Sequence, residues 1–178
     1  MISQNNSSDA TDEVDRIVLA WQIERPDLDV SPMEVYSRVA RLARHLDLAR
    51  KEAFNTQGME PWEFDVLSVL RRAAAPYSLT PGTLLQELLV SSGTMTNRID
   101  RLEKKGLVKR TPSPHDRRAV LVTLTDEGVT RVDSALKELL QRESELVAPL
   151  YGEERKELSG LLRRLLLPFE GTPVRPLR

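Results

Sequence analysis

One change of spacing limits the fold of this chain more than any other feature: within residues 91–125 the apolar residues pass from helical to alternating intervals. Met95, Ile99 and Leu102 follow one another at intervals of four and three residues, which predicts a helix with one buried face. After Gly106 apolar and polar residues alternate, which is typical of a half-buried strand. A helix that runs directly into a strand is therefore the centre of the predicted fold.

The ends of these elements carry their own signals. Ser91 is placed to accept a hydrogen bond from the Thr94 amide and so to cap the helix, and Gly106 to end it in the left-handed conformation. A strand after Gly106 and a second strand at 120–124 predict a hairpin. Their connection at 112–118 contains two prolines and ends in two adjacent arginines. We therefore expect a stiff wing with a basic tip, suited to the narrow minor groove.

Opposite its apolar face the predicted helix carries Thr94, Asn97, Arg98 and Arg101 at helical spacing. Side chains of these types read base edges and bind phosphates. Residues 91–118 hold eight Lys or Arg and three Asp or Glu, a net charge of +5 in a chain whose total is −1. This local excess predicts a nucleic-acid surface that the overall charge hides. The alternative, a solvated helix face beside an exposed hairpin, is disfavoured by the order of cap, helix, glycine and hairpin.

Residues 79–128 resemble the winged helix-turn-helix of the MarR family of transcriptional regulators. They contain T-x-R-x-x-x-L-E-K-K-G-L-V-x-R followed by D-x-R-x-x-x-V-x-L-T, which is the signature of that family. The resemblance implies that residues 91–105 enter the major groove, that Arg118 enters the minor groove and that Asp116 holds the wing through an ion pair. The predicted DNA-binding residues are Ser91, Ser92, Thr94, Thr96, Asn97, Arg98, Arg101, Arg110, Asp116, Arg117 and Arg118.

Composition excludes several classes of protein. With 178 residues, 40% of them hydrophobic, the chain has room for a real core in one soluble domain. We expect a cytoplasmic protein without a membrane partner, because no apolar run could span a bilayer and no secretory signal is present. The absence of cysteine excludes a disulfide, a thiolate nucleophile and a cysteine-bound metal. His45 and His115 lack the spacing of a metal site or a catalytic base, so we predict no enzyme, no metal and no cofactor.

The predicted fold class is mostly α, a winged helix-turn-helix domain with long terminal dimerisation helices. Helical spacing predicts an extra N-terminal helix from Thr11 to about Ile23 and a second helix that begins at Pro32. The chain then divides into a disordered N-terminus (1–10), an N-terminal extra helix and dimerisation helix (11–57), a DNA-binding lobe (58–125), C-terminal dimerisation helices (126–167) and an extended tail (168–178).

Besides the recognition helix, four further helices are expected between residue 58 and residue 167. Within the lobe we expect a helix over 62–74 and a short one that Thr80 and Pro81 begin. Beyond the lobe we expect a long helix capped by Thr125 and a last helix over 153–167.

The two C-terminal helices carry leucine stripes that the lobe does not need for its own core. A symmetric dimer would bury these stripes against each other, whereas packing within one chain is the plainer alternative. In a dimer the two recognition helices would lie about 34 Å apart, over a palindromic operator in double-stranded DNA with half-sites about 10 base pairs apart. The family resemblance implies the same homodimer.

Trp21, Asp65, Arg98 and Arg110 fall at spacings similar to those of the urate-responsive branch of the MarR family, which also carries an extra N-terminal helix. The resemblance implies an anionic-ligand site: arginines hold an oxyanion, an indole stacks on it and a carboxylate accepts a ring N–H. Asp65 would pair with an arginine in the empty protein, so that the ligand releases a recognition-helix residue. Each residue also has a plainer interpretation, as core, structural ion pair or phosphate contact.

We therefore predict a homodimeric, sequence-specific DNA-binding transcriptional regulator. It would be a repressor that a small anionic ligand, such as urate, another purine or a tricarboxylate, releases from DNA. Two alternatives stay open: a regulator of the same fold without a small-molecule effector, and a protein-interaction scaffold.

Overall fold

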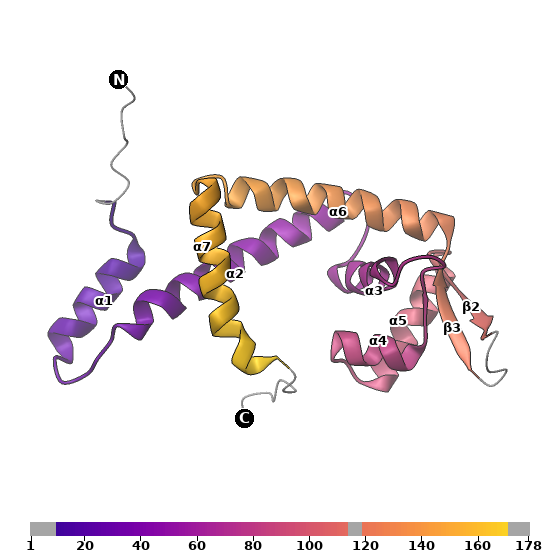
Figure 1. Cartoon of the computed structure of the whole chain (residues 1–178), viewed down its shortest axis with the longest axis horizontal. Coiled ribbons are helices and arrows are strands. Elements are labelled where there is room, and N and C mark those ends of the chain that lie inside the picture. The colour runs from indigo at the N-terminus through magenta and orange to yellow at the C-terminus, as the bar shows by residue number, and fades with distance from the viewer. Residues whose placement is uncertain (1–9, 114–118, 171–178) are drawn as a thin grey trace, which may run out of the picture. The chain divides into compact units, whose positions relative to one another are not determined.

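The structure, a computed structural model, describes residues 10–113 and 119–170, which are mostly helical. Figure 1 shows their elements, which follow the order α1 (Glu13–Glu24), α2 (Pro32–Asn55), α3 (Pro61–Arg72), β1 (Ser78–Leu79), α4 (Pro81–Leu88), α5 (Ser92–Lys104), β2 (Val108–Pro112), β3 (Val120–Leu124), α6 (Asp126–Leu146), α7 (Gly152–Leu166) and the short 3-10 helix η1 (Leu167–Phe169). The predicted helices are all present, and so is the predicted hairpin.

The chain forms two compact units, and the boundary between them falls after Leu48, inside α2. The N-terminal unit contains α1, whose first turn is capped by the Asp12 side chain. Arg38 of α2 holds this end of α1, because its Nε lies 2.8 Å from Asp12 Oδ2 and its Nη2 lies 2.5 Å from Asp15 Oδ1. The hydrogen bond to Arg38 lowers the pKa of Asp12 below its ordinary value, so this ion pair persists into mildly acidic solution.

In the second unit the end of α2, the helices from α3 to α6 and a small sheet enclose one core. The sheet is antiparallel with the order β1-β3-β2, and β3 lies in its centre. Helix α3 contributes Phe64, Leu67 and Leu70, and the Phe64 ring stacks on that of Phe54 with centroids 4.4 Å apart. Helix α5 contributes the predicted apolar face. Helix α6 closes the same core with Val132, Ala135 and Leu139.

Strand β1 was not predicted. Its two residues pair with β3, Ser78 opposite Thr123 and Leu79 opposite Val122, and the hydroxyl oxygens of Ser78 and Thr123 lie 2.6 Å apart. A strand of two residues is too short to show alternation, so the sequence pattern carries no signal for it.

Side-chain caps fix the starts of the lobe helices where the sequence predicts them. The Thr83 amide donates to Thr80 Oγ1 over 3.1 Å, and the Gly128 amide donates to Thr125 Oγ1 over 3.0 Å. Thr125 Oγ1 also donates to the carbonyl of Gly106, 2.7 Å away. The start of α6 is therefore tied to the point where α5 turns into the wing.

The C-terminal tail differs from the expectation. We predict an extended tail from Pro168, but Leu167–Phe169 forms one 3-10 turn, because the carbonyl of Leu167 accepts a hydrogen bond from the Glu170 amide over 3.2 Å. The predicted disorder at 1–9 and the rest of the tail at 171–178 lie outside the described residues.

No helix among the described residues has both the length and the apolar character that crossing a bilayer requires. Residues 10–113 and 119–170 also contain no group of three histidine or acidic side chains placed to hold a metal.

Gly128 generates a prediction about stability. A Cβ atom at this position would lie 2.1 Å from the carbonyl oxygen of Leu107, whereas a Cβ at Gly82 of α4 would meet no heavy atom closer than 3.7 Å. We expect Gly128→Ala to lower the free energy of unfolding by about 3 kcal/mol, because backbone must move to admit the methyl group. Urea unfolding measures this, with Gly82→Ala as the matched control; equal midpoints for both variants would contradict it.

Candidate nucleic-acid interface

Helix α5 has one buried face and one exposed face, as the sequence predicts. Met95, Ile99 and Leu102 are at most 1% exposed and belong to the lobe core. The Thr94 amide donates to the hydroxyl of Ser91 over 3.3 Å, which confirms the predicted cap. At the other end Gly106 has a φ of 72°, which confirms the left-handed stop. The core contacts therefore dictate which side chains of α5 remain outside.

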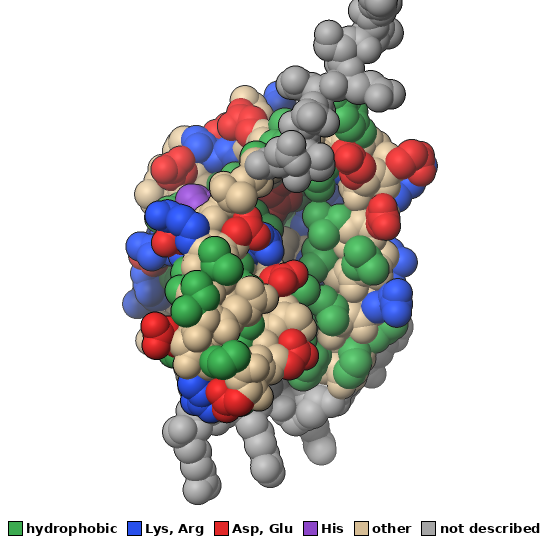
Figure 2. Space-filling model, turned by 90° about the vertical axis from the view of Figure 1, so that its left-hand side faces the viewer, with side chains coloured by type: hydrophobic (Ala, Val, Ile, Leu, Met, Phe, Trp, Pro, Cys, Tyr) green, Lys and Arg blue, Asp and Glu red, His purple; other side chains and the backbone are tan. Residues whose placement is uncertain are grey.

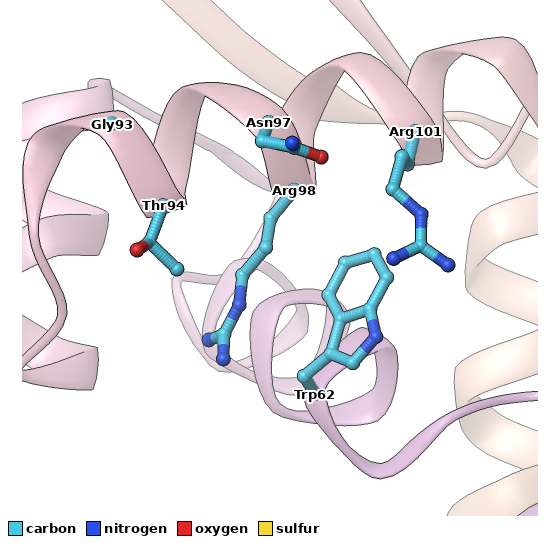
Figure 3. Close-up of a pocket in the computed structure, with 6 residues that line it drawn as sticks. All are labelled: Trp62, Gly93, Thr94, Asn97, Arg98 and Arg101. Carbon is cyan, nitrogen blue, oxygen red and sulfur yellow. The ribbon is translucent and has the colours of Figure 1, made fainter.

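The predicted polar residues of α5 lie together on its outer side. Thr94, Asn97, Arg98 and Arg101 line one surface depression of about 440 Å³, shared with Gly93 and with Trp62 of α3. Figure 3 shows the long side chains of the two arginines extending from α5 on either side of the indole. Ser91, Ser92 and Thr96 are also exposed, although Thr96 Oγ1 donates back to the carbonyl of Ser92 over 3.0 Å.

Trp62 is the residue of this surface that sequence reasoning missed. Its ring centroid lies 5.5 Å from Cζ of Arg98 and 4.8 Å from Cζ of Arg101, both within the range of a cation–π contact. The contact joins the first turn of α3 to α5. The one available local signal was an aromatic residue directly after the proline that begins a helix, and this signal does not indicate which residues the aromatic side chain contacts.

Arg110 fixes the base of the wing to α5. Its guanidinium forms ion pairs with Asp100 and Glu103, and its backbone N–H donates to Glu103 Oε1 over 3.0 Å. The hydrogen bond to Asp100 is the main cause that raises the pKa of Arg110 above its ordinary value. The C-terminal end of α5 and the first residues of β2 are therefore held together.

A buried carboxylate fixes the same, C-terminal end of α5 to α3. Glu63 of α3 is completely buried, and the Nζ atom of Lys105 lies 2.6 Å from its Oε1. The other carboxylate oxygen accepts the Glu60 amide over 3.0 Å. This pair orients the last turn of α5 against α3, because an unpaired charge at a buried position would be costly.

These ion pairs reduce the number of unpaired positive charges on the surface around α5. Arg101, Lys105 and Arg110 each have a carboxylate partner, at distances up to the 3.8 Å that separates Arg101 from Glu60. Among the described residues, Arg98, Lys104 and Lys109 of this region form no such ion pair. The positive charge available to a polyanion is therefore concentrated on fewer residues than the number of basic residues suggests. The predicted Asp116, Arg117 and Arg118, like His115, lie outside the described residues.

The three residues of the predicted ligand site that lie in the second unit, Asp65, Arg98 and Arg110, have different partners there. Asp65 pairs with Arg50, whose Nη2 lies 2.9 Å from its Oδ1, and not with Arg98 or Arg110 as the ligand hypothesis expects. The structural ion pair is therefore the interpretation of Asp65 that the geometry favours. Arg98 lies against Trp62 and Arg110 against its two carboxylates. Trp21 is a half-exposed residue of α1, in the N-terminal unit.

Comparisons with known proteins agree on one family. A family model described as the MarR family matches residues 57–119. The HTH-type transcriptional regulator PecS of Dickeya dadantii (strain 3937) is 39% identical over 153 residues, which cover 86% of this chain and 92% of that protein. The multiple antibiotic resistance protein MarR of Escherichia coli (strain K12) is 31% identical over 144 residues, 76% of this chain and 98% of its own length.

A solved structure extends the comparison to the fold. A crystal structure of a mutant MarR from E. coli complexed with operator DNA has a TM-score of 0.64 to this chain at 30% identity. The alignment covers 78% of this chain and 99% of that one. The winged helix-turn-helix fold predicted from the sequence is confirmed.

The Arg110 ion pairs generate a prediction about the wing. We expect Arg110→Ala to increase amide hydrogen exchange in β2 and β3 while lowering the free energy of global unfolding by only about 1 kcal/mol, because the groups are partly solvated. Lys109→Ala is the matched control, since the neighbouring side chain has no such partners among the described residues. Unchanged exchange in β2 would show that the pair does not hold the wing.

Proposed function

This chain belongs to the MarR family of transcriptional regulators, and we propose that it represses transcription by binding a palindromic operator as a homodimer. Helix α5 would lie in the major groove and the wing in the adjacent minor groove. The observation that carries this proposal is the sorting of α5 into a fully buried apolar face and an outer face with Thr94, Asn97, Arg98 and Arg101. The relative solved with operator DNA supports it.

The chemistry of the outer face assigns a role to each side chain. Asn97 suits a bidentate contact with adenine, and Arg98 and Arg101 suit guanine or phosphate. The first turn of α5, with Ser91 and Ser92, presents backbone amides and a helix dipole that favour a phosphate. Thr94 and Thr96 would add hydroxyl contacts near the same end.

The wing would supply the second grip. Lys109 is exposed on β2, and Arg117 and Arg118 follow in the sequence of the wing tip. An arginine at such a tip would enter the narrow minor groove, where the negative potential is strongest. Asp116 would hold the tip through an ion pair, and Arg110 would keep the wing in register with α5 instead of contacting DNA itself.

The C-terminal helices support the homodimer. Helix α7 contains no buried residue, and five of its leucines and one of η1 are 38% to 58% exposed: Leu158, Leu161, Leu162, Leu165, Leu166 and Leu167. In α6 the second half likewise exposes Leu136, Leu140 and Leu146. Figure 2 shows hydrophobic side chains in bands between charged ones on the face that it presents.

A second copy of the chain is the partner that these leucines fit. Apolar stripes of this extent rarely stay in water, and a two-fold axis would pair each stripe with its own copy. Sedimentation equilibrium tests the pairing, and a mass equal to one chain would exclude it. As a dimeric regulator of transcription the protein would act in the cytoplasm, where it meets DNA.

Release by a small anion is the second part of the proposal. The resemblance to the urate-responsive branch, including the helix α1 with Trp21, supports a site for urate, another purine or a tricarboxylate at Trp21, Asp65, Arg98 and Arg110. An anion that recruits Arg98 and Arg110 would take them from Trp62 and from Asp100 and Glu103. Binding would then loosen the contacts that hold α5 and the wing, which explains release without any further device.

A regulator without an effector is the alternative that a specific observation favours. Asp65 already has Arg50 as its partner, and Arg110 has two carboxylates. An incoming anion must compete with all of these.

DNA binding gives a prediction about salt and specificity. If each protomer neutralises about four phosphates, log K should fall against log salt with a slope near −7. Fluorescence anisotropy with a selected genomic site measures this, and a slope near −1 would contradict a grip on the backbone. Arg118→Ala should weaken every site alike, whereas Asn97→Ala should relax preference at one base position. The absence of any sequence-preferred binding would favour a protein-interaction scaffold.

The effector gives a separate prediction. Titration of urate, xanthine, citrate and aconitate against the complex of protein and operator should release DNA for at least one of them. The chain has two tryptophans, so the Trp62→Phe variant isolates the Trp21 fluorescence signal. Asp65→Asn should shift the response, with Asp133→Asn, which removes the partner of Arg71 elsewhere in the lobe, as the matched control. If none of these compounds changes DNA binding, the result favours the alternative function, a regulator without a small-molecule effector.

A further inference from the structure

We propose that Trp62 is a positioning residue for DNA recognition: its indole holds the guanidinium groups of Arg98 and Arg101 in the poses with which α5 meets the duplex. The inference rests on the proposed function, because it concerns how the outer face of α5 is prepared for DNA. It adds a residue from a different helix to that surface.

The geometry places one aromatic ring beneath two cations. Arg98 and Arg101 are three residues apart on α5, so their side chains emerge from neighbouring positions on the same face. Their Cζ atoms lie 5.5 Å and 4.8 Å from the Trp62 ring centroid. Figure 3 shows both guanidinium groups beside the indole, with Thr94 and Asn97 along the same side of the helix.

The indole is anchored better than the arginines. Trp62 is partly buried and packs against the hydrophobic core of the lobe, and it lies in the first turn of α3, directly after Pro61. An arginine side chain has many rotamers in water, and a duplex must select the productive one. A fixed aromatic platform that favours the held rotamer by about threefold for each arginine would spare DNA that selection.

Contacts besides those of Trp62 also hold α3 and α5 in place. The buried Glu63–Lys105 pair joins the two helices, and Met95, Ile99 and Leu102 of α5 belong to the same hydrophobic core as the buried residues of α3. Removing the indole should therefore free the arginines while leaving the helix packing in place. This separation makes a positioning role distinguishable from a structural one.

The test compares Trp62→Tyr, which keeps an aromatic face, with Trp62→Leu, which keeps apolar bulk without one. We expect Trp62→Leu to weaken operator binding by about tenfold and Trp62→Tyr by less than about threefold, consistent with two lost cation–π contacts. Urea unfolding of both variants monitors the fold. Equal operator affinities for Leu, Tyr and the natural residue would overturn the proposal.

A double-mutant cycle decides whether Trp62 acts through the arginines. In a background of Arg98→Met and Arg101→Met, measured at low salt to keep binding detectable, Trp62→Leu should change affinity by less than about twofold. A tenfold loss in that background would show that the indole supports the lobe instead, which overturns the proposal.

Fluorescence provides an independent signal. In the Trp21→Phe variant Trp62 is the sole tryptophan, and its emission should change when operator DNA draws the arginines away or covers the depression. An unchanged emission at saturating operator would count against the proposal. If the unmodified chain binds no DNA at all, the proposed function fails and this inference fails with it. If the unmodified chain binds DNA and the Trp62 variants bind it equally well, this inference alone fails.

Discussion

Burial of the apolar face of α5 is the constraint on which the rest of the structure depends. Met95, Ile99 and Leu102 are enclosed by the lobe, and burying side chains of this size contributes roughly 1.5–3 kcal/mol each. The helix cannot rotate about its axis without exposing them. The orientation of Thr94, Asn97, Arg98 and Arg101 toward the outside is thus a consequence of hydrophobic packing, which precedes any interaction with DNA.

Electrostatic contacts then refine what packing has oriented. Lys105 joins the end of α5 to the buried Glu63, while Arg110 joins β2 to the carboxylates of α5. Each contact uses a cation that the composition alone would assign to the nucleic-acid surface. Some of the basic residues in and near α5 therefore serve the protein's own architecture, and the remaining ones are left for the proposed attraction to phosphate.

The predictability of these features follows the range of the interactions behind them. Caps, glycine stops and apolar periodicity act within a few residues, so the sequence was sufficient to predict α5, its Ser91 cap and the hairpin. Trp62 was missed because its contacts are with residues far away in the chain: Arg98 lies 36 positions after it, and Arg101 lies further still. Asp65 pairs with an arginine, as expected, but the partner is Arg50 of α2 and not an arginine of the recognition helix, because sequence alone does not rank the available cations.

The close approach at Gly128 has a mechanical consequence. The first turn of α6 rests directly on the carbonyl of Leu107 at the root of β2, so helix and wing root share one rigid junction. With 21 residues, α6 is about 30 Å long, and tilting it by about 5° displaces its far end by about 3 Å. A force on the leucine-bearing end of α6 would therefore be passed, as along a lever, to the root of the wing.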